Sequence, residues 1–461
     1  MYKKISIWIV FLVLLMILFF TILFGSLLVH YFEYGARFPK IQKIAISIAS
    51  VPINFEKILR YGNRLEPLKK IPRVHSERVE KITKIKKNND GNYIKFYNKS
   101  INSNRNELLI LPRYDREKQT SVVEIIDLSN LEVIHRYNHN IDNAYKDLNV
   151  GSGNTKKRFQ YGHPLILEDG SLIAKNVMFS PLFKIDICGK DLWRNYNYRF
   201  HHSLELDHEN NVWASSSFLN IDDSVLKNIS IIREGKSFSN DAIIKINPKT
   251  GQVLFKKSIS AILLENNIFN DSDIYMSTDP IHLNDIQPVY EDGPFWKKGD
   301  VFLSLLRNSS IIHYRPETDQ LINFIKGPFF EQHDIDILSE NEISIFNNNN
   351  SLMDDKKYSE LLVYNFETKK FKKILSDQFE SKNFKTETEG LADFSKNGSI
   401  MVEETNGGRI LFYNKKGNLE WEFVNVSNDG KIYPVSWSRL ISNVNMVKNI
   451  KDSIKNQKCS N

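Results

Sequence analysis

The stretch DPIHLNDIQPV (279–289) is followed by GDVFLSLLRNSSIIHY (299–314) and EQHDIDILSENEISIFNN (331–348). Each segment contains short apolar or alternating runs, bounded by Asp, Asn, Gly and Ser. Runs of this length and pattern are typical of β-strands with a buried face. His282 and His333 each open such a run, and Arg307 ends another. The stretch therefore predicts antiparallel strands that carry polar, chemically active groups at their ends.

One kind of hairpin recurs from about residue 90 onward. An apolar strand ends in a polar residue, a short polar turn follows, and a second strand begins with a large apolar residue. The six strand-ending residues are Asp127, Asp186, Asn247, Arg315, Asn365 and Asn414. A repeat of roughly 50–70 residues indicates a propeller in which each hairpin belongs to one four-stranded blade. We expect an all-β, six-bladed β-propeller over residues 90–440. A double β-sandwich is the structural alternative, but it does not explain the common spacing.

A second repeat places histidines at equivalent positions. A leading residue is followed two and four positions later by strand residues, and then by a turn and another strand. The leading residues are His163, His202, His282, His333 and Gly390. In a propeller the innermost strands all begin at one end of the central channel, so we expect the four histidines to surround that end. The repeat selects His202 rather than its neighbour His201. We keep His201, His163 and Asn284 as candidates for substrate binding.

Converging imidazoles suit either a transition metal or an anion. Arg307 favours the anion, because a guanidinium cannot ligate a metal ion and repels it. The sequence thus predicts a site for an anion with several oxygen atoms, with no metal and no cofactor. The sequence leaves open whether Asp334 and Asp336 point away from His333 or orient it.

The ordered set FHHSLELDHENNVWA (200–214), DPIHLNDIQP (279–288), GDVFLSLLRNSSIIHY and EQHDIDILSENEISIFNN resembles the bacterial arylsulfate sulfotransferases, which are arylsulfotransferase β-propellers. The closing GSIMVEETNGGRILFYNKKGNLEWEFVN (398–425) and YPVSWSRLI (433–441) resemble the last blade of that family, and the likeness covers roughly residues 150–440.

The resemblance implies a six-bladed propeller that moves a sulfuryl group from a phenolic sulfate ester to a phenol. It also implies that no nucleotide sulfate donor is used. His333 matches the nucleophile that carries the sulfuryl group as a sulfohistidine. His282 and Arg307 match the groups that bind the sulfate oxygens, and His202 matches a further histidine of the pocket.

The sequence is also compatible with two other functions. Many propellers only bind ligands, so the main alternative is a non-enzymatic, membrane-anchored propeller that binds a sulfated or otherwise anionic ligand. A quinone-dependent dehydrogenase shares turns such as NPKTGQVLF (247–255). That enzyme would need acidic calcium ligands and stacked tryptophans, and the sequence offers no such set.

The run from Ile5 to Val29 has no charged side chain. At about 1.5 Å per residue it is long enough to cross a hydrocarbon core of about 30 Å. A signal peptide cleaved near Gly25 is the alternative, and we expect an uncleaved transmembrane anchor over residues 1–30. Lys3 and Lys4 precede the run and favour a cytoplasmic N-terminus. We therefore expect a single-pass protein of the bacterial inner membrane, with residues 31–89 connecting the anchor to a propeller in the periplasm.

The net charge of +7 is spread along the chain, and we expect no nucleic-acid partner. The expected partners are an aryl sulfate donor, a phenolic acceptor and the membrane. Cys188 and Cys459 are too few and too distant in sequence to predict a disulfide framework or a zinc site, and we expect both to be unpaired. Residues 216–242 are interpreted as an insertion into the propeller, and residues 441–461 as a polar tail.

Overall fold

The computed structural model describes residues 7–34, 93–96, 106–144, 159–177, 180–218, 224–227, 229–233, 235, 238–270, 273–274, 279–350, 358–457 and 459. The chain forms two compact units. The smaller unit comprises Met1–Lys69, Asp222–Phe238 and Leu263–Pro280. The larger unit comprises Lys70–Ile221, Ser239–Ile262 and Ile281–Asn461.

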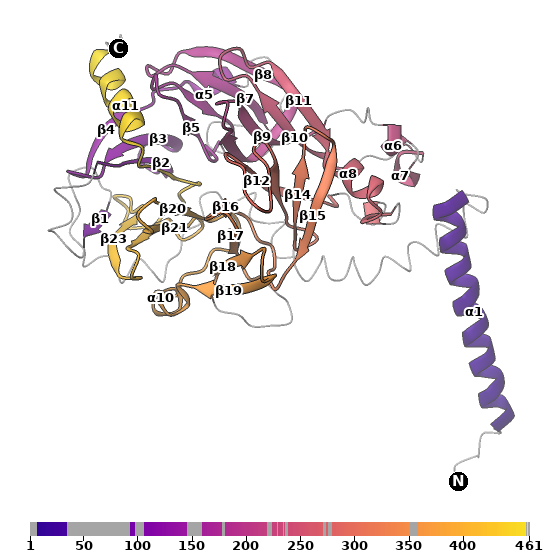
Figure 1. The fold of residues 1–461 in the computed structure, drawn as a ribbon. Coiled ribbons are helices and arrows are strands. Elements are labelled where there is room, and N and C mark those ends of the chain that lie inside the picture. The colour runs from indigo at the N-terminus through magenta and orange to yellow at the C-terminus, as the bar shows by residue number, and fades with distance from the viewer. Residues whose placement is uncertain are drawn as a thin grey trace. The chain divides into compact units, whose positions relative to one another are not determined.

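The larger unit is an all-β, propeller-like set of antiparallel sheets, with β16 and β20 toward its middle and β19 at its edge (Figure 1). One four-stranded sheet has the order β12-β13-β14-β15 (Leu283–Pro288, Val301–Leu305, Ser310–Arg315, Gln320–Lys326). A second has the order β16-β17-β18-β19 (Ile335–Ile337, Glu342–Asn347, Glu360–Asn365, Lys370–Ile374). The third has the order β24-β2-β3-β4 (Arg439–Ile441, Leu108–Asp115, Thr120–Asp127, Glu132–Arg136).

The two remaining sheets are larger. The five-stranded sheet has the order β1-β23-β22-β21-β20 (Tyr93–Phe96, Leu419–Val424, Arg409–Tyr413, Ile400–Glu404, Leu391–Phe394). The seven-stranded sheet has the order β11-β10-β9-β8-β7-β6-β5 (Val253–Ser258, Asp241–Ile246, Val212–Ser217, Asp191–Leu206, Ser180–Ile185, Leu172–Ala174, Leu165–Ile166).

The prediction of six separate blades is therefore wrong. Four of the sheets among the described residues have the form of a single blade, and the fifth is a seven-stranded sheet. The cause is β8, a strand of 16 residues that pairs with β7 up to Phe200 and with β9 from Arg199 to Leu206. Its register with β9 shifts between Phe200 and Leu204. A register irregularity bends a strand, so one continuous strand serves two four-stranded ladders.

All six predicted hairpins are present, each joining the last two strands of a four-stranded ladder. In the five hairpins whose strand ends in Asp or Asn, that residue closes the turn through its own side chain, whereas Arg315 pairs with Asp300. For example, Asp186 Oδ1 accepts the N–H of Cys188 at 2.9 Å, and Asn414 Oδ1 accepts that of Lys416 at 3.0 Å. Asp and Asn favour such turns because the short side chain replaces a backbone acceptor. This local chemistry explains why the hairpins could be read from the sequence.

The propeller closes by pairing the two ends of the larger unit. β24 follows the last blade in sequence, yet it hydrogen-bonds to β2, with Leu109 opposite Leu440. Arg113 also forms an isolated bridge with Val435. The apolar face of this sheet packs on the five-stranded sheet through buried Leu109, Ile126 and Trp421. Unfolding one end of the unit therefore exposes apolar surface at the other.

The C-terminal residues are not the polar tail that we predicted. Val444–Asn456 form helix α11, which begins where the side chain of Asn443 accepts the N–H groups of Asn445 and Met446. Val447 and Ile450 are fully buried in the same core cluster as Leu108 and Phe183. Lys451 forms an ion pair of 2.5 Å with Asp127. The apolar stripe at i and i+3 is typical of a helix that covers a core.

The prediction of unpaired cysteines is also wrong, because Cys188 and Cys459 form a disulfide. They lie 271 residues apart in sequence. Cys188 lies in the turn between β7 and β8, and α11 brings Cys459 back to it. The disulfide thus covalently joins the end of the chain to the seven-stranded sheet.

Replacing either cysteine by serine is expected to lower the free energy of unfolding by about 2–4 kcal/mol, because the closed loop no longer restricts the unfolded chain. Urea unfolding of the larger unit measures this. Cys188→Ser, Cys459→Ser and the double variant should give the same loss, and reductant should reproduce it in the native protein. Unchanged unfolding midpoints in all three variants would contradict the expectation.

The smaller unit contains α1 (Ile7–Tyr34), α6 (Ser224–Lys227) and α7 (Ser230–Arg233). Among the described residues, α1 is the one helix long and apolar enough to cross a membrane, over Trp8–Ser26. A signal sequence would have the same length and apolar composition. Helices α6 and α7 lie in the predicted insertion, between β9 and β10. The predicted connector lies almost wholly outside the described residues. The remaining short helices are α5 (Ile141–Ala144), α8 (Ile259–Glu265) and α10 (Ser376–Ser381).

Candidate functional site

Residues that lead the innermost strands share an unusual backbone conformation. The φ angle is 47° at His163, 49° at His202, 56° at His282 and 59° at Trp437. Non-glycine residues rarely adopt positive φ, and where they do the surrounding structure holds them there. At His163, His282 and Trp437 this conformation lies one or two residues before a strand, and at His202 it lies inside β8, at the register shift between Phe200 and Leu204. His333 differs, since the left-handed residue in its segment is Glu331, two positions earlier.

The fifth predicted leading position, Gly390, also has a positive φ of 90°. A Cβ atom there would lie 2.5 Å from the ring of Phe346. The backbone can take this path only without a side chain. This explains why the repeat has glycine rather than histidine at this position, and it places the preceding residue, Glu389, close to His333.

Three of the predicted histidines lie together. The ring centroid of His202 is 5.1 Å from that of His282 and 6.0 Å from that of His333. The indole of Trp437 lies 6.2 Å from both His202 and His333, and 5.0 Å from His163. The sequence contains no local signal for Trp437 beyond its place in the closing blade. The cluster therefore consists of imidazoles around one aromatic ring.

His333 is 2% exposed, and both its ring nitrogens have partners. Nδ1 lies 2.7 Å from Asn348 Oδ1 and 3.0 Å from the carbonyl of Glu331, and both of these atoms can only accept. The backbone N–H of Glu389 donates to Nε2 at 3.0 Å. The neighbours therefore assign the proton to Nδ1 and the lone pair to Nε2. Burial lowers the pKa of His333 to about 4, so the ring is neutral near pH 7.

Asn348, which contacts Nδ1 of His333, also binds the segment that contains Glu389. Its Nδ2 group donates to the carbonyls of Thr386 and Glu389, at 3.1 and 2.8 Å. It lies in the run Asn347–Asn350, which the sequence presents only as a polar strand end. All four amides of this run make hydrogen bonds, and nothing in the sequence distinguishes the one that contacts the histidine.

His202 is fixed by two neighbours. Its Nδ1 lies 2.7 Å from Nδ1 of His201, and its backbone carbonyl accepts a hydrogen bond from the ammonium of Lys175. Lys175 is fully buried and also donates to the carbonyl of Gly162 at 3.2 Å. Burial lowers the pKa of Lys175 to about 7. Burial and the adjacent His201 hold the pKa of His202 well below its usual range.

His201 is 3% exposed and lies behind His202. Its Nε2 is 3.6 Å from Oδ1 of Asp241, the first residue of β10. Asp241 is 1% exposed, accepts the N–H of Leu283 at 2.7 Å through Oδ2, and accepts Ser239 Oγ at 3.1 Å through Oδ1. Asp241 was not among the predicted residues, because strand pairing alone brings it to the histidines.

Two further predicted residues lie next to the cluster. The backbone N–H of Arg307 donates to the carbonyl of Ile281 at 3.1 Å, which places Arg307 beside His282 at the end of β13. Asn284 is fully buried, and its Nδ2 donates to the carbonyl of Gln332 at 2.6 Å. Asn284 thus contacts the backbone directly before His333.

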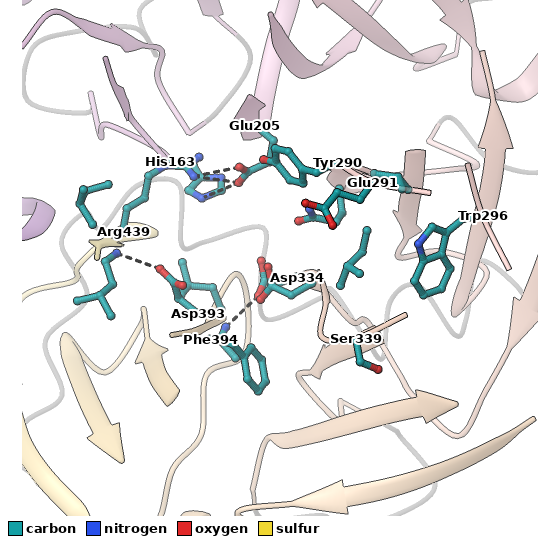
Figure 2. A pocket seen from close by; sticks show the side chains of 18 of the residues that line it. His163, Glu205, Tyr290, Glu291, Trp296, Asp334, Ser339, Asp393, Phe394 and Arg439 are labelled. Carbon is teal, nitrogen blue, oxygen red and sulfur yellow. Dashed lines mark hydrogen bonds and ion pairs between the residues drawn. The ribbon is translucent and has the colours of Figure 1, made fainter. Parts of the chain in front are cut away.

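His163 lies at the edge of a cavity of about 630 Å³ (Figure 2). Its Nε2 is 3.4 Å from Glu205, which is also paired with Arg439. Burial raises the pKa of Glu205 to about 7 and holds the pKa of His163 well below its usual range. His163 and Glu205 therefore line this cavity together, whereas His202, His282 and His333 are not among its lining residues.

Carboxylates tie the innermost strands to one another around the centre. Asp285 accepts the N–H of Ile335, Asp334 that of Ala392 and Asp393 that of Leu440, at 2.9–3.0 Å. Innermost strands of neighbouring sheets do not form a ladder, so side chains satisfy the backbone donors. Asp334 therefore bonds to the next strand rather than to His333. Burial raises the pKa of Asp334 and of Asp336 well above the usual range.

Among the residues that the structure describes, no three His, Cys, Asp or Glu side chains are arranged to hold a metal ion. The chemistry available at the cluster is that of a neutral imidazole with a defined lone pair, a neighbouring pair of imidazoles, and an arginine beside His282. Such a set can act by nucleophilic attack and proton transfer.

The model of the arylsulfotransferase (ASST) family matches residues 151–426, and the chain belongs to this family. Membership implies aryl sulfotransferase activity at the level of the family. No curated protein sequence matches the chain.

Two solved structures are similar over most of the chain. One is a protein of unknown function from Bacteroides caccae, with 13% identity, 73% of this chain and 98% of the other covered, and a TM-score of 0.46. The second is catalytically inactive virginiamycin B lyase from Staphylococcus aureus with quinupristin, with 10% identity, 74% and 88% covered, and a TM-score of 0.38.

Proposed function

We propose that this protein transfers a sulfuryl group from an aryl sulfate to a phenol through a sulfohistidine on His333, without a nucleotide sulfate donor. The observation that carries the proposal is the state of His333. It is a buried, neutral imidazole with Nδ1 bound to acceptors, and its Nε2 lone pair accepts the backbone N–H of Glu389. Nearby His202 and His282 supply the other imidazoles that the transfer requires.

In the first half-reaction, Nε2 of His333 exchanges the Glu389 N–H for the sulfur atom of the donor. The Nε2–S bond forms as the bond between sulfur and the phenolic oxygen breaks, and the phenolate leaves with the electron pair. The ring becomes cationic on sulfurylation, and Asn348 Oδ1 accepts its Nδ1–H and stabilises that charge. Splitting the transfer at a covalent intermediate gives ping-pong kinetics.

In the second half-reaction, the oxygen of the acceptor phenol attacks sulfur and the Nε2–S pair returns to His333. His282 and Arg307 bind the sulfuryl oxygens, on which negative charge accumulates. Asn284 and Asn348 orient the His333 segment through the bonds described above. His163, on the wall of the neighbouring cavity, is assigned to substrate binding.

Release of nitrophenol from 4-nitrophenyl sulfate, with and without a phenol acceptor, tests the proposal directly. Transfer predicts release that accelerates with acceptor and yields the acceptor's sulfate ester. Tight binding of aryl sulfates without turnover, in a protein that retains its fold, would instead support a non-enzymatic anion-binding propeller.

The acid limb of kcat/KM for the donor is expected near pH 4, because that profile reports the free enzyme and the pKa of His333 is lowered to about 4. Attack requires the neutral ring, so activity is retained as the pH falls through 6.5 and is lost only toward 4. Asn348→Ala should reduce the pH-independent value of kcat/KM about tenfold, because it removes one hydrogen bond that contributes ~1.4 kcal/mol.

The same substitution should move the acid limb to still lower pH, because the bond to Asn348 raises the pKa of His333. Asn349→Ala is the matched control, since Asn349 donates to the carbonyl of Tyr358 and does not contact the histidine in any described bond. An acid limb near 6.5 in the native protein would show that an ordinary imidazole controls the reaction.

We further propose that α1 is an uncleaved anchor in the bacterial inner membrane and that the larger unit faces the periplasm. The Cys188–Cys459 disulfide supports a periplasmic location of the larger unit, because disulfides persist in oxidising compartments. Protease added to intact spheroplasts should digest the larger unit. Protection until the membrane is lysed would place that unit in the cytoplasm.

A further inference from the structure

A chain of three buried side chains leads away from the histidine cluster. It runs from His202 through His201 to Asp241, with 2.7 Å between the two Nδ1 atoms and 3.6 Å between His201 Nε2 and Asp241 Oδ1. His201 and Asp241 are almost fully buried, at 3% and 1% exposed. The sequence predicts His201 as a substrate-binding candidate, whereas no sequence pattern singles out Asp241.

The Asp241 carboxylate determines which nitrogen of each imidazole in this chain carries the proton. The Asp241 carboxylate favours the form of His201 with its proton on Nε2, because a lone pair facing a buried carboxylate would be repelled. His201 Nδ1 is then an acceptor. The 2.7 Å contact requires one donor and one acceptor, so His202 carries its proton on Nδ1. Nε2 of His202 is left with a lone pair, on the side of the ring away from His201.

We propose that Asp241 and His201 form a relay that keeps Nε2 of His202 unprotonated, so that His202 acts as the general base toward the acceptor phenol. This inference rests on the proposed sulfuryl transfer. His202 is the catalytic residue of the relay, and His201 and Asp241 are positioning residues. The arrangement resembles a catalytic triad in its logic, with a second imidazole in the middle position.

The proton balance of the complete reaction closes through His202. In the second half-reaction the acceptor's O–H proton moves to Nε2 of His202 as its oxygen bonds to sulfur. The resulting imidazolium donates Nδ1–H to His201, and the Asp241 carboxylate, 3.6 Å from Nε2 of His201, stabilises the cation by its charge. Because the pKa of His202 lies well below its usual range, Nε2 releases this proton to water before the next first half-reaction, and the departing phenolate takes up a proton from water, so the balance closes.

Other hydrogen bonds hold the residues of the relay in place. Asp241 is anchored by the N–H of Leu283, next to His282, and by Ser239. Lys175 binds the carbonyl of His202. Three strands from two sheets, β8, β10 and β12, therefore meet at the relay. Both imidazoles keep their relative positions only while these strands stay packed.

Asp241→Asn tests the relay with little change in shape. The new amide can still accept the Leu283 N–H, but its NH₂ group favours a lone pair on His201 Nε2 and so inverts both tautomers. The expected result is a loss of about 10²-fold or more in kcat for transfer. Asp285→Asn is the matched control, because Asp285 is equally buried and accepts the N–H of Ile335 without contacting an imidazole in any described bond. It should stay within about threefold of the native protein.

His201→Phe provides a second variant that leaves Asp241 intact. Members of one relay act as a unit, so the double variant should be no slower than the slower single variant. The relay would be overturned if the losses in kcat of the two single variants multiplied in the double variant. Equal activity in Asp241→Asn and Asp285→Asn would also overturn it.

Imidazole ¹⁵N shifts give a readout that does not depend on turnover. His202 should be protonated on Nδ1 in the native protein and on Nε2 in Asp241→Asn. If the native protein is active but the tautomer of His202 does not change in the variant, the relay is wrong and the sulfuryl transfer stands. If the tautomer inverts while the native protein transfers no sulfuryl group, the coupling of Asp241 to His202 is upheld, and the proposed function is wrong together with the base role of His202.

Discussion

His333→Ala should lose at least about 10⁴-fold in kcat for sulfuryl transfer, because the variant has no atom to carry the sulfuryl group between donor and acceptor. The residual rate should no longer show ping-pong kinetics. His333 lies among Asn348, Glu331 and Glu389, so the replacement removes a ring that closes several hydrogen bonds. Circular dichroism and the unfolding midpoint should be recorded to separate lost chemistry from lost fold.

Two further variants make this result specific. His208→Ala removes an imidazole from the β8–β9 turn, outside the cluster, and should retain native activity. His333→Gly leaves a cavity the size of the ring, and added imidazole should restore part of the rate. Native-like turnover in His333→Ala would show that another histidine, or no histidine, carries the sulfuryl group.

Arg307→Met is expected to reduce kcat/KM for the donor by about 10²–10³-fold, the loss found when one donor to a developing oxyanion is removed. Its backbone pairs with Ile281, next to His282, at the end of β13. If the guanidinium holds the sulfuryl oxygens more strongly in the transition state, kcat falls along with kcat/KM. If it binds only the ground state, KM rises and kcat is unchanged.

Arg307→Lys separates charge from geometry. Lysine keeps the charge but cannot offer two parallel N–H groups to one sulfuryl group, so it should recover only part of the loss. Arg315→Met is the matched control in the same sheet, because Arg315 pairs with Asp300 at 2.7 Å. It should lower stability without changing kcat/KM by more than about twofold. If Arg307→Met kept the kcat/KM of the native protein, Arg307 would not bind the sulfuryl group.

The hairpins and the histidine repeat could be predicted because both are local. Asp186 and Asn414 close their turns with their own side chains, so the signal lies within a few residues. His202 and His282 occupy one phase of a strand repeat and share left-handed backbone. Membership of the arylsulfotransferase family agrees with the motifs that suggested it.

What the sequence did not predict depends on contacts between distant segments. Cys459 reaches Cys188 only because α11 folds back on the core through Val447 and Ile450. Six separate blades were expected because six hairpins recur, and the continuous strand β8 has no sequence signal of its own.

The partners of the histidines were missed for the same reason. Lys175 and Asp241 reach the carbonyl of His202 and the ring of His201 from other strands, and Asn348 reaches His333 across the β16–β17 hairpin. In the sequence, these residues are ordinary strand ends. Their roles follow from sheet pairing, which single-sequence periodicity does not determine.

The sulfohistidine itself provides the most direct test. The full-length protein is incubated with 4-nitrophenyl sulfate without acceptor and digested with trypsin, and the peptides are measured by mass spectrometry. Cleavage after Lys326 and Lys356 gives a peptide, 327–356, whose single histidine is His333, whereas His201 and His202 fall in 200–227. We predict one added sulfuryl group on 327–356 that disappears when a phenol is supplied. A stable label on another peptide, or acceptor sulfation with no labelled peptide at any time, would contradict the proposed mechanism.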